Sequence, residues 1–141
     1  MVATQQLFAG DVEAGMELPE VVRKPSRVQL FRFSAVTWNA HRLHYDQAYA
    51  MQEGYPDVLV QSHLHGCFLV QTLMDWAGPS ARLRAFRWQN RRLATPNDEL
   101  RCSGTIRHVE GKVIQIDLLE VNQRGELCAP GWATVELPLK E

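Results

Sequence analysis

The chain has 141 residues, of which 45% are hydrophobic and 22% are charged, and its formal net charge at pH 7 is -1. This length is typical of one domain, which we expect over residues 1–141, and such a chain can bury roughly two-thirds of its unfolded surface. A net charge this close to zero provides no overall positive field, so the composition argues against binding to nucleic acid or to an anionic membrane.

The cysteines and the N-terminal residues bear on the compartment. Cys67, Cys102 and Cys128 are odd in number, widely separated, and without the Cys-x-x-Cys spacing of zinc sites and redox motifs. We predict that all three are reduced core residues and that none binds a metal. Residues 1–10 contain neither a basic segment nor an apolar run, and no stretch is as apolar as a membrane span. We therefore expect a cytoplasmic protein.

The first quarter of the chain predicts one strand and one helix. Met16–Lys24 has the character of a short edge strand, interrupted by Pro19, which cannot donate a backbone hydrogen bond. Ser26 is a suitable N-cap for a helix that runs to about Val36, because apolar residues then recur at three- and four-residue spacings.

Two further helices follow. Asp46 can cap a short helix over residues 47–53 that ends at Gly54, which leaves residues 41–45 as a turn between helices. His63–Ala77 is apolar around most of the helix circumference, and this pattern is typical of a helix inside a core.

The remaining chain changes to the alternating period of strands. Apolar residues alternate over residues 83–88, 100–109, 113–121 and 127–137, and turn-forming residues separate these segments. We predict four strands in meander order. The fold class is then α+β, with one antiparallel sheet wrapped around one long central helix, which is the hot-dog arrangement.

Between the first two helices lies a segment rich in groups that handle protons. Thr37–Asp46 holds two of the five histidines, a carboxamide, a guanidinium, a phenol and a carboxylate, directly after an apolar run. Burying polar groups without partners costs roughly 1–3 kcal/mol each. Such a concentration of polar groups beside apolar residues indicates a pocket.

This segment also carries a family resemblance. Phe33–Asp46, followed by Gly54-Tyr55-Pro56 and an apolar helix, resembles the MaoC-like hot-dog hydratases and dehydratases over roughly residues 10–137. It is most similar to the branch of mesaconyl-CoA hydratases and 3-hydroxyacyl-thioester dehydratases, where Thr-aromatic-Asn-x-His-Arg-aliphatic-His-Tyr-Asp recurs. The resemblance implies a hydro-lyase that adds water reversibly to a 2-enoyl-CoA thioester, including short dicarboxylic ones such as mesaconyl-CoA, without a metal or redox cofactor.

The resemblance also implies roles for individual residues. The better-known family motif is Asp-x-Asn-Pro-x-His, and here His44 occupies its His position, Asn39 its Asp position and His41 its Asn position. A carboxamide can orient water but cannot take a proton, so the base role passes to His44, while His41 either orients it or transfers protons itself. Ser62 replaces the glycine whose backbone N–H polarises the thioester carbonyl.

Other polar residues admit structural interpretations. Arg42 is expected to form an ion pair with Asp46 or Asp57. His63 and His65 are two residues apart, and this spacing places them on different faces of a helix and argues against a metal pair.

An arginine cluster follows the long helix and comprises Arg82, Arg84, Arg87, Arg91 and Arg92. It is either a solvated strand face or a binding surface for the phosphates of coenzyme A, with Arg87 and Arg91 as phosphate ligands. In the second case Trp88 would stack on adenine. A nucleic-acid strip is disfavoured by the nearly neutral net charge.

Two other functions remain open at this point. One is an acyl-CoA thioesterase on the same fold. The other is a non-catalytic subunit of a hetero-oligomeric dehydratase, which Asn39 and Ser62 favour because they replace the common Asp and Gly. Since a lone hot-dog sheet leaves an unpaired edge strand, we expect a homodimer or a larger homo-oligomer.

Overall fold

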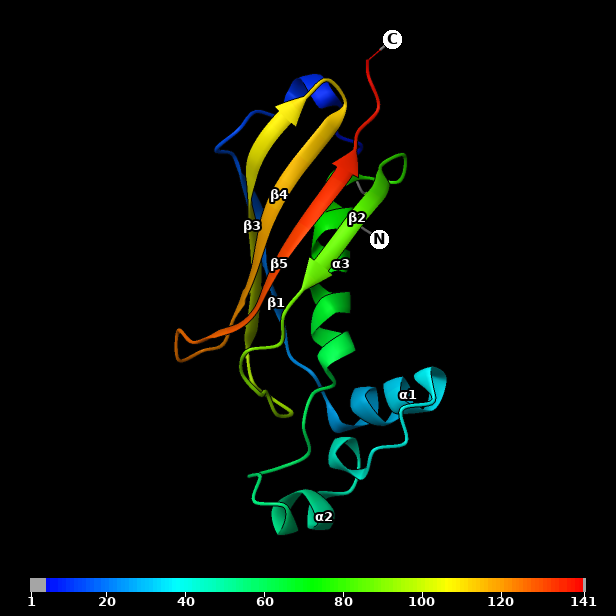
Figure 1. Ribbon diagram of the computed structural model, residues 1–141, viewed down its shortest axis with the longest axis vertical. Helices are drawn as coiled ribbons and strands as arrows, with labels where there is room; N and C mark the ends of the chain where they lie inside the picture. The colour runs from blue at the N-terminus through cyan, green and yellow to red at the C-terminus, as the bar shows by residue number, and fades with distance from the viewer. Residues whose placement is uncertain (1–4, 141) are drawn as a thin grey trace.

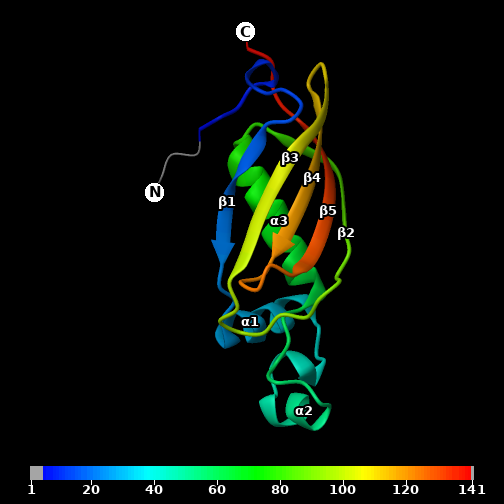
Figure 2. The ribbon, with the colours of Figure 1, turned by 90° about the vertical axis from the view of Figure 1, so that its left-hand side faces the viewer.

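The computed structural model describes residues 5–140, while residues 1–4 and 141 lie outside the described part. Its main element is a five-stranded sheet with the strand order β1-β3-β4-β5-β2, in which all neighbours are antiparallel. The strands are β1 (Glu17–Arg23), β2 (Arg82–Trp88), β3 (Leu100–Glu110), β4 (Val113–Val121) and β5 (Leu127–Glu136). Figure 1 shows β3, β4, β5 and β2 side by side, and Figure 2 shows β1 beside β3.

The meander prediction is wrong for one strand. β3, β4 and β5 follow one another, but β2 pairs with β5 at the sheet edge instead of with β3. The segment between β2 and β3, residues 89–99, is long enough to cross the ends of two intervening strands, which are about 5 Å apart. The alternating pattern of a strand shows which face is buried, but it does not specify the neighbouring strand.

The predicted edge strand is confirmed as β1. Pro19 falls where the register of β1 against β3 shifts, between Leu18 and Val21. Because proline has no backbone N–H, this irregular position accommodates it without the loss of a ladder hydrogen bond.

Helix α3 (Ser62–Ala77) crosses the inner face of the sheet, and Figure 2 shows it behind the strands. Its buried apolar side chains, such as Phe68, Leu69 and Leu73, belong to the same core cluster as Ile116 and Leu118 of β4. The hot-dog arrangement is confirmed.

Helix α3 is less apolar around its circumference than predicted. His63, Cys67, Gln71 and Asp75 recur every four residues and form an exposed stripe. The prediction that all three cysteines are core residues is therefore wrong for Cys67.

The other two cysteines, Cys102 and Cys128, are buried, and all three thiols are free. Burial and the nearby Glu120 raise the pKa of the Cys102 thiol to about 12 and that of the Cys128 thiol to about 11.

The short helices gather beyond one end of the sheet (Figure 1). They are α1 (Arg27–Thr37), the 3-10 helix η2 (Arg42–His44) and α2 (Gln47–Gln52), while a second 3-10 helix, η1 (Ala9–Asp11), precedes β1. Both predicted caps are confirmed: Ser26 Oγ accepts from the Gln29 N–H at 3.2 Å, and Asp46 Oδ1 accepts from the Tyr49 N–H at 3.1 Å. Among residues 5–140, no helix has the length and apolar character needed to cross a bilayer.

Candidate functional site

The polar segment begins at a sharp turn after α1. Trp38 caps the C-terminus of α1 with φ +53°, in the left-handed region, which costs a residue with a side chain roughly 1 kcal/mol. The turn brings the Asn39 N–H to 3.0 Å from the Ser34 carbonyl oxygen. Asn39 Oδ1 in turn accepts from the His41 N–H at 3.4 Å. The backbone therefore fixes Asn39 next to the end of α1.

The two histidines of the segment are held in different ways. His41 Nδ1 accepts from the Leu43 N–H at 3.3 Å and caps η2, which places the proton of the neutral ring on Nε2. His44 Nδ1 lies 2.8 Å from the Leu59 carbonyl oxygen. Because a carbonyl only accepts, Nδ1 of His44 carries the proton, and Nε2 of the neutral ring keeps a free lone pair.

The surroundings of His44 favour the neutral ring. Partial burial lowers the pKa of His44 below its ordinary value of 6.5, the hydrogen bond to Leu59 raises it in part, and the charge of His41 lowers it further. The ring centroids of His41 and His44 are 6.0 Å apart. At neutral pH the His44 imidazole is therefore able to accept a proton at Nε2.

The remaining polar groups of the segment are structural. Arg42 donates to Asp46 Oδ2 from Nε at 3.1 Å and from Nη2 at 2.7 Å, which confirms the first of the two predicted ion pairs. Asp57 pairs instead with Arg27, at 2.6 Å. The Tyr45 hydroxyl donates to the Ala40 carbonyl at 2.8 Å. These bonds hold the turn that carries the histidines.

Two links tie this segment to the start of α3, where Ser62 is the first residue. Gln61, fully buried, donates from Nε2 to the Leu30 carbonyl at 2.8 Å and to Ser34 Oγ at 2.9 Å. Ser34 therefore bonds both Asn39, through its carbonyl, and Gln61, through its hydroxyl. The second link is the bond between His44 and Leu59, three residues before Ser62. Hydrogen bonds thus join the segment with Asn39, His41 and His44 to Leu59 and Gln61, which precede Ser62 in the chain.

Two hollows open beside the segment. One, of about 310 Å³, is lined by Phe31, Ser34, Ala35, Trp38, Asn39, Ala40 and Tyr45. The other, of about 240 Å³, is lined by Arg27, Val28, Phe31, His44, Tyr45 and Val58. Phe31 and Tyr45 line both hollows and meet edge to face with their ring centroids 6.5 Å apart. Asn39 and His44 therefore face adjoining hollows on either side of this aromatic pair, and Ser62 lies outside both.

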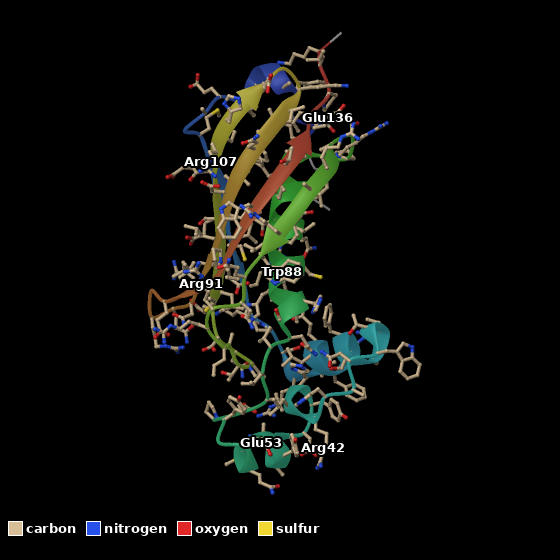
Figure 3. All side chains as sticks on the ribbon, viewed as in Figure 1. Arg42, Glu53, Trp88, Arg91, Arg107 and Glu136 are labelled. Atoms are coloured by element: carbon tan, nitrogen blue, oxygen red, sulfur yellow. The ribbon has the colours of Figure 1, made fainter. Side chains whose placement is uncertain are left out.

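The predicted phosphate-binding arginines are all exposed but do not form one group. Arg84 pairs with Glu136, and Figure 3 shows Glu136 and Arg91 at opposite ends of the sheet. The guanidinium of Arg87 lies 4.8 Å above the ring of Trp132, and Arg91 donates to Gln89 Oε1 at 2.8 Å. Binding of coenzyme A phosphates by Arg87 and Arg91 stays a prediction.

Trp88 lies where the sheet meets the start of α3, while Arg42 lies further away in the short helices (Figure 3). The indole Nε1 of Trp88 donates to the Ser62 carbonyl at 3.1 Å. The indole stacks on Phe86 and meets the edge of His63, in each case with centroids 5.5 Å apart. Stacking of Trp88 on adenine also stays a prediction.

The sequence-based predictions missed a buried polar pair. His65 of α3 and Glu120 of β4 are both fully buried, and His65 Nδ1 bonds Glu120 Oε1. His65 and His63 lie on different faces of α3, as their spacing predicted. Glu120 continues the inward alternation of Ile116 and Leu118 along β4, so the strand pattern contained the signal for a buried carboxylate.

Within residues 5–140, no three histidine, cysteine, aspartate or glutamate side chains are grouped so that they could hold a metal ion.

Comparisons with known proteins identify the family of the chain. A model of the family hydroxyacyl-thioester dehydratase type 2 matches residues 14–96, well over half of the chain. The chain is 53% identical over 49 residues to mesaconyl-C(4)-CoA hydratase of Chloroflexus aurantiacus, a match that covers 34% of this chain and 16% of that protein.

Two solved structures are similar in fold. R-hydratase PhaJ1 from Pseudomonas aeruginosa superposes with a TM-score of 0.90 at 19% identity, covering 96% of this chain and 88% of that one. A chain of the ChsH1-ChsH2 complex from Mycobacterium tuberculosis superposes with a TM-score of 0.82 at 20% identity, covering 89% and 98%. The predicted resemblance is confirmed, and the extent of the family match shows that the chain belongs to the hydroxyacyl-thioester dehydratase type 2 family of MaoC-like hot-dog proteins.

Proposed function

We propose that the protein is an enoyl-CoA hydratase, which in the reverse direction is a 3-hydroxyacyl-thioester dehydratase. The observation that carries this proposal is the hydrogen bond from His44 Nδ1 to the Leu59 carbonyl, which leaves Nε2 free as a base. The family to which the chain belongs and the partial match to a mesaconyl-CoA hydratase support the same substrate class.

His44 performs the proton transfers in this proposal. In hydration, Nε2 takes a proton from water as the oxygen attacks C3 of the 2-enoyl thioester. The electron pair of the double bond moves toward the thioester carbonyl and forms an enolate. The imidazolium then returns its proton to C2, so that water has been added as OH and H. In dehydration the same ring removes the C2 proton and protonates the leaving hydroxyl.

The enolate oxygen needs a donor, and Ser62 is suited to this role. Backbone N–H groups in the first turn of a helix have no acceptor within the helix, and they lie at its partially positive end. The N–H of Ser62, at the start of the 16-residue α3, would donate to the enolate oxygen.

Asn39 and His41 support the reaction. Because Asn39 Oδ1 accepts from the His41 N–H, its Nδ2 hydrogens remain available to orient water or the thioester carbonyl. His41 holds this arrangement through its backbone and lies beside His44. Arg87 and Arg91 bind the phosphates of coenzyme A, since exposed guanidinium groups match phosphate oxygens in pairs.

We also propose a cytoplasmic homodimer in which the sheet continues across the interface. Among residues 5–140, β2 pairs only with β5, so its outer edge is open over Arg82–Trp88 in the described part of the chain. Light scattering should give twice the 16.1 kDa of one chain. A value for one chain at micromolar concentration would contradict the dimer.

The direct test is a panel of 2-enoyl-CoA esters that includes mesaconyl-CoA and apolar esters of increasing length. Hydration removes the conjugated double bond, so the absorbance of the conjugated thioester should fall without release of free thiol. Release of thiol from acyl-CoA would instead show a thioesterase.

A second candidate is a subunit that completes the site of another protein. Asn39 and Ser62 favour it, because they replace the acid and the glycine of the common motif, and one fold relative was solved in a complex of two proteins. Inactivity of the purified chain on the whole panel, with activity restored by a partner chain, would favour this candidate.

A further inference from the structure

Trp88 contacts the N-terminal part of α3 at two positions. Its indole N–H donates to the carbonyl of Ser62, the first residue of the helix. Its ring lies against Gly66, one turn further along, where a Cβ atom would be 2.9 Å from Cε2 and 3.0 Å from Cδ2 of the indole. Any larger residue at position 66 would displace the ring.

The packing of Trp88 against the helix therefore explains why position 66 is a glycine. Glycine in the interior of a helix is less favourable than alanine, since it loses more conformational entropy when the helix forms. Gly66 is buried and lies within α3, yet its φ angle is negative and requires no glycine. The close approach of Trp88 is the feature of this site that excludes a side chain.

The indole is itself held in place. Phe86, two residues earlier on the same face of β2, stacks on it with an interplanar angle of 12°. His63, which belongs to the exposed stripe of α3, packs against the indole with an interplanar angle of 73°. Trp88 pairs with Gly131 in the ladder between β2 and β5, so its backbone is fixed by the sheet.

We infer that Trp88 is a positioning residue that sets the orientation of the first turn of α3, and with it the direction of the Ser62 N–H. In a helix the Ser62 carbonyl already accepts from the Gly66 N–H, and the indole adds a second donor from outside the helix. The sheet thus holds the helix end through one side chain. Misplacement of a reacting group by about 1 Å can lower a rate by about 100-fold, so the position of this turn matters for catalysis.

This inference rests on the proposed function, and it differs from the stacking of Trp88 on adenine in a measurable way. The variant Trp88→Phe keeps an aromatic ring but removes the donor to Ser62. Two substrates separate the roles: a 2-enoyl-CoA ester, and the matching thioester of N-acetylcysteamine, which lacks adenosine and its phosphates. A positioning role predicts that kcat falls about 10-fold on both substrates while KM changes little.

A second variant tests the same contact from the helix. Gly66→Ala favours the helix by propensity but displaces the indole, so kcat should fall as it does in Trp88→Phe. The double variant should lose less than the product of the two single losses, because both remove one contact. Trp76→Phe, at the other end of α3, is the matched control and should leave kcat unchanged.

Amide hydrogen exchange gives a readout that does not depend on activity. In Trp88→Phe, the amides of residues 65–66 should exchange about 3-fold to 10-fold faster, while amides of the last turn of α3 should not change. Unchanged exchange, or a KM effect confined to the CoA ester, would overturn the inference. If wild type hydrates no enoyl thioester, the proposed function fails, and the exchange data still decide whether Trp88 holds the turn.

Discussion

His44 Nδ1 is 2.8 Å from the carbonyl oxygen of Leu59, and this bond joins the histidine segment to the residues that lead into α3. The bond fixes the ring and its tautomer together, because only a protonated Nδ1 can donate to a carbonyl. The proposed base is therefore oriented by the backbone of Leu59, which lies three residues before Ser62, the first residue of α3.

His44→Ala should lower kcat by about 100-fold or more with little change in KM, because it removes the group that moves protons in the transition state. The measurement is steady-state hydration of the best 2-enoyl-CoA ester. His108→Ala is the matched control, since His108 is exposed on β3 and far along the chain from the site. Equal activity of His44→Ala and wild type would rule out His44 as the base.

The pH dependence of kcat/KM should follow His44. Burial lowers the pKa of His44 below its ordinary value of 6.5. The neutral, basic ring predominates above this lowered pKa, so activity should be lost as the pH falls through it. In His41→Ala the inflection should move to higher pH, since the charge of His41 is one cause of the lowered pKa. A profile that lacks an acidic limb below pH 6.5 would contradict this assignment.

Asn39→Asp distinguishes the enzyme from the non-catalytic subunit. If the chain is an enzyme, wild type is active and the aspartate leaves activity similar or lowers it, because a carboxylate cannot donate as the Nδ2 hydrogens do. The measurement is the same hydration assay on both forms. Activity that appears only in Asn39→Asp would show that His44 alone is not a sufficient base.

Replacement of Arg87 and Arg91 by alanine should raise KM for CoA esters with little effect on kcat, which is the signature of binding shared by the ground state and the transition state. Arg82→Ala, at the other end of β2, is the control and should leave KM unchanged. A double variant with the KM of wild type would mean that the arginines are a solvated face.

The buried pair of His65 and Glu120 should respond cooperatively to substitution. Glu120→Ala leaves the buried imidazole without its hydrogen-bond partner, and such a loss costs about 1–3 kcal/mol in the free energy of unfolding. His65→Leu combined with Glu120→Leu should cost less than the sum of the single variants, because no unpaired polar group remains. Urea denaturation of the four proteins checks this, and strictly additive losses would contradict it.

Local features of the fold could be predicted from the sequence. Ser26 and Asp46 bond amides three residues away, so short-range chemistry determines both caps. Pro19 was expected at an edge because of its missing donor. These features depend on neighbours in the sequence and require no knowledge of the tertiary structure.

Features that depend on distant residues could not be predicted in the same way. The pairing of β2 with β5 joins segments about 50 residues apart, and no local pattern specifies it. The contact of Trp88 with Gly66 depends on that pairing, so the role of Gly66 could not be predicted from the sequence. The candidate site was found because its residues are contiguous from Asn39 to His44, whereas Gln61 and Ser34, which join it to α3, carry no distinctive signal.

The two edges of the sheet differ in a way that limits assembly. Pro19 has no N–H to offer and lies at a register shift, so β1 cannot support a regular ladder with another strand. The opposite edge, β2, contains no proline over its seven residues. In the proposed homodimer, pairing through β2 would occupy the one edge that is open in residues 5–140, so no second edge would remain from which a continuous fibre could grow.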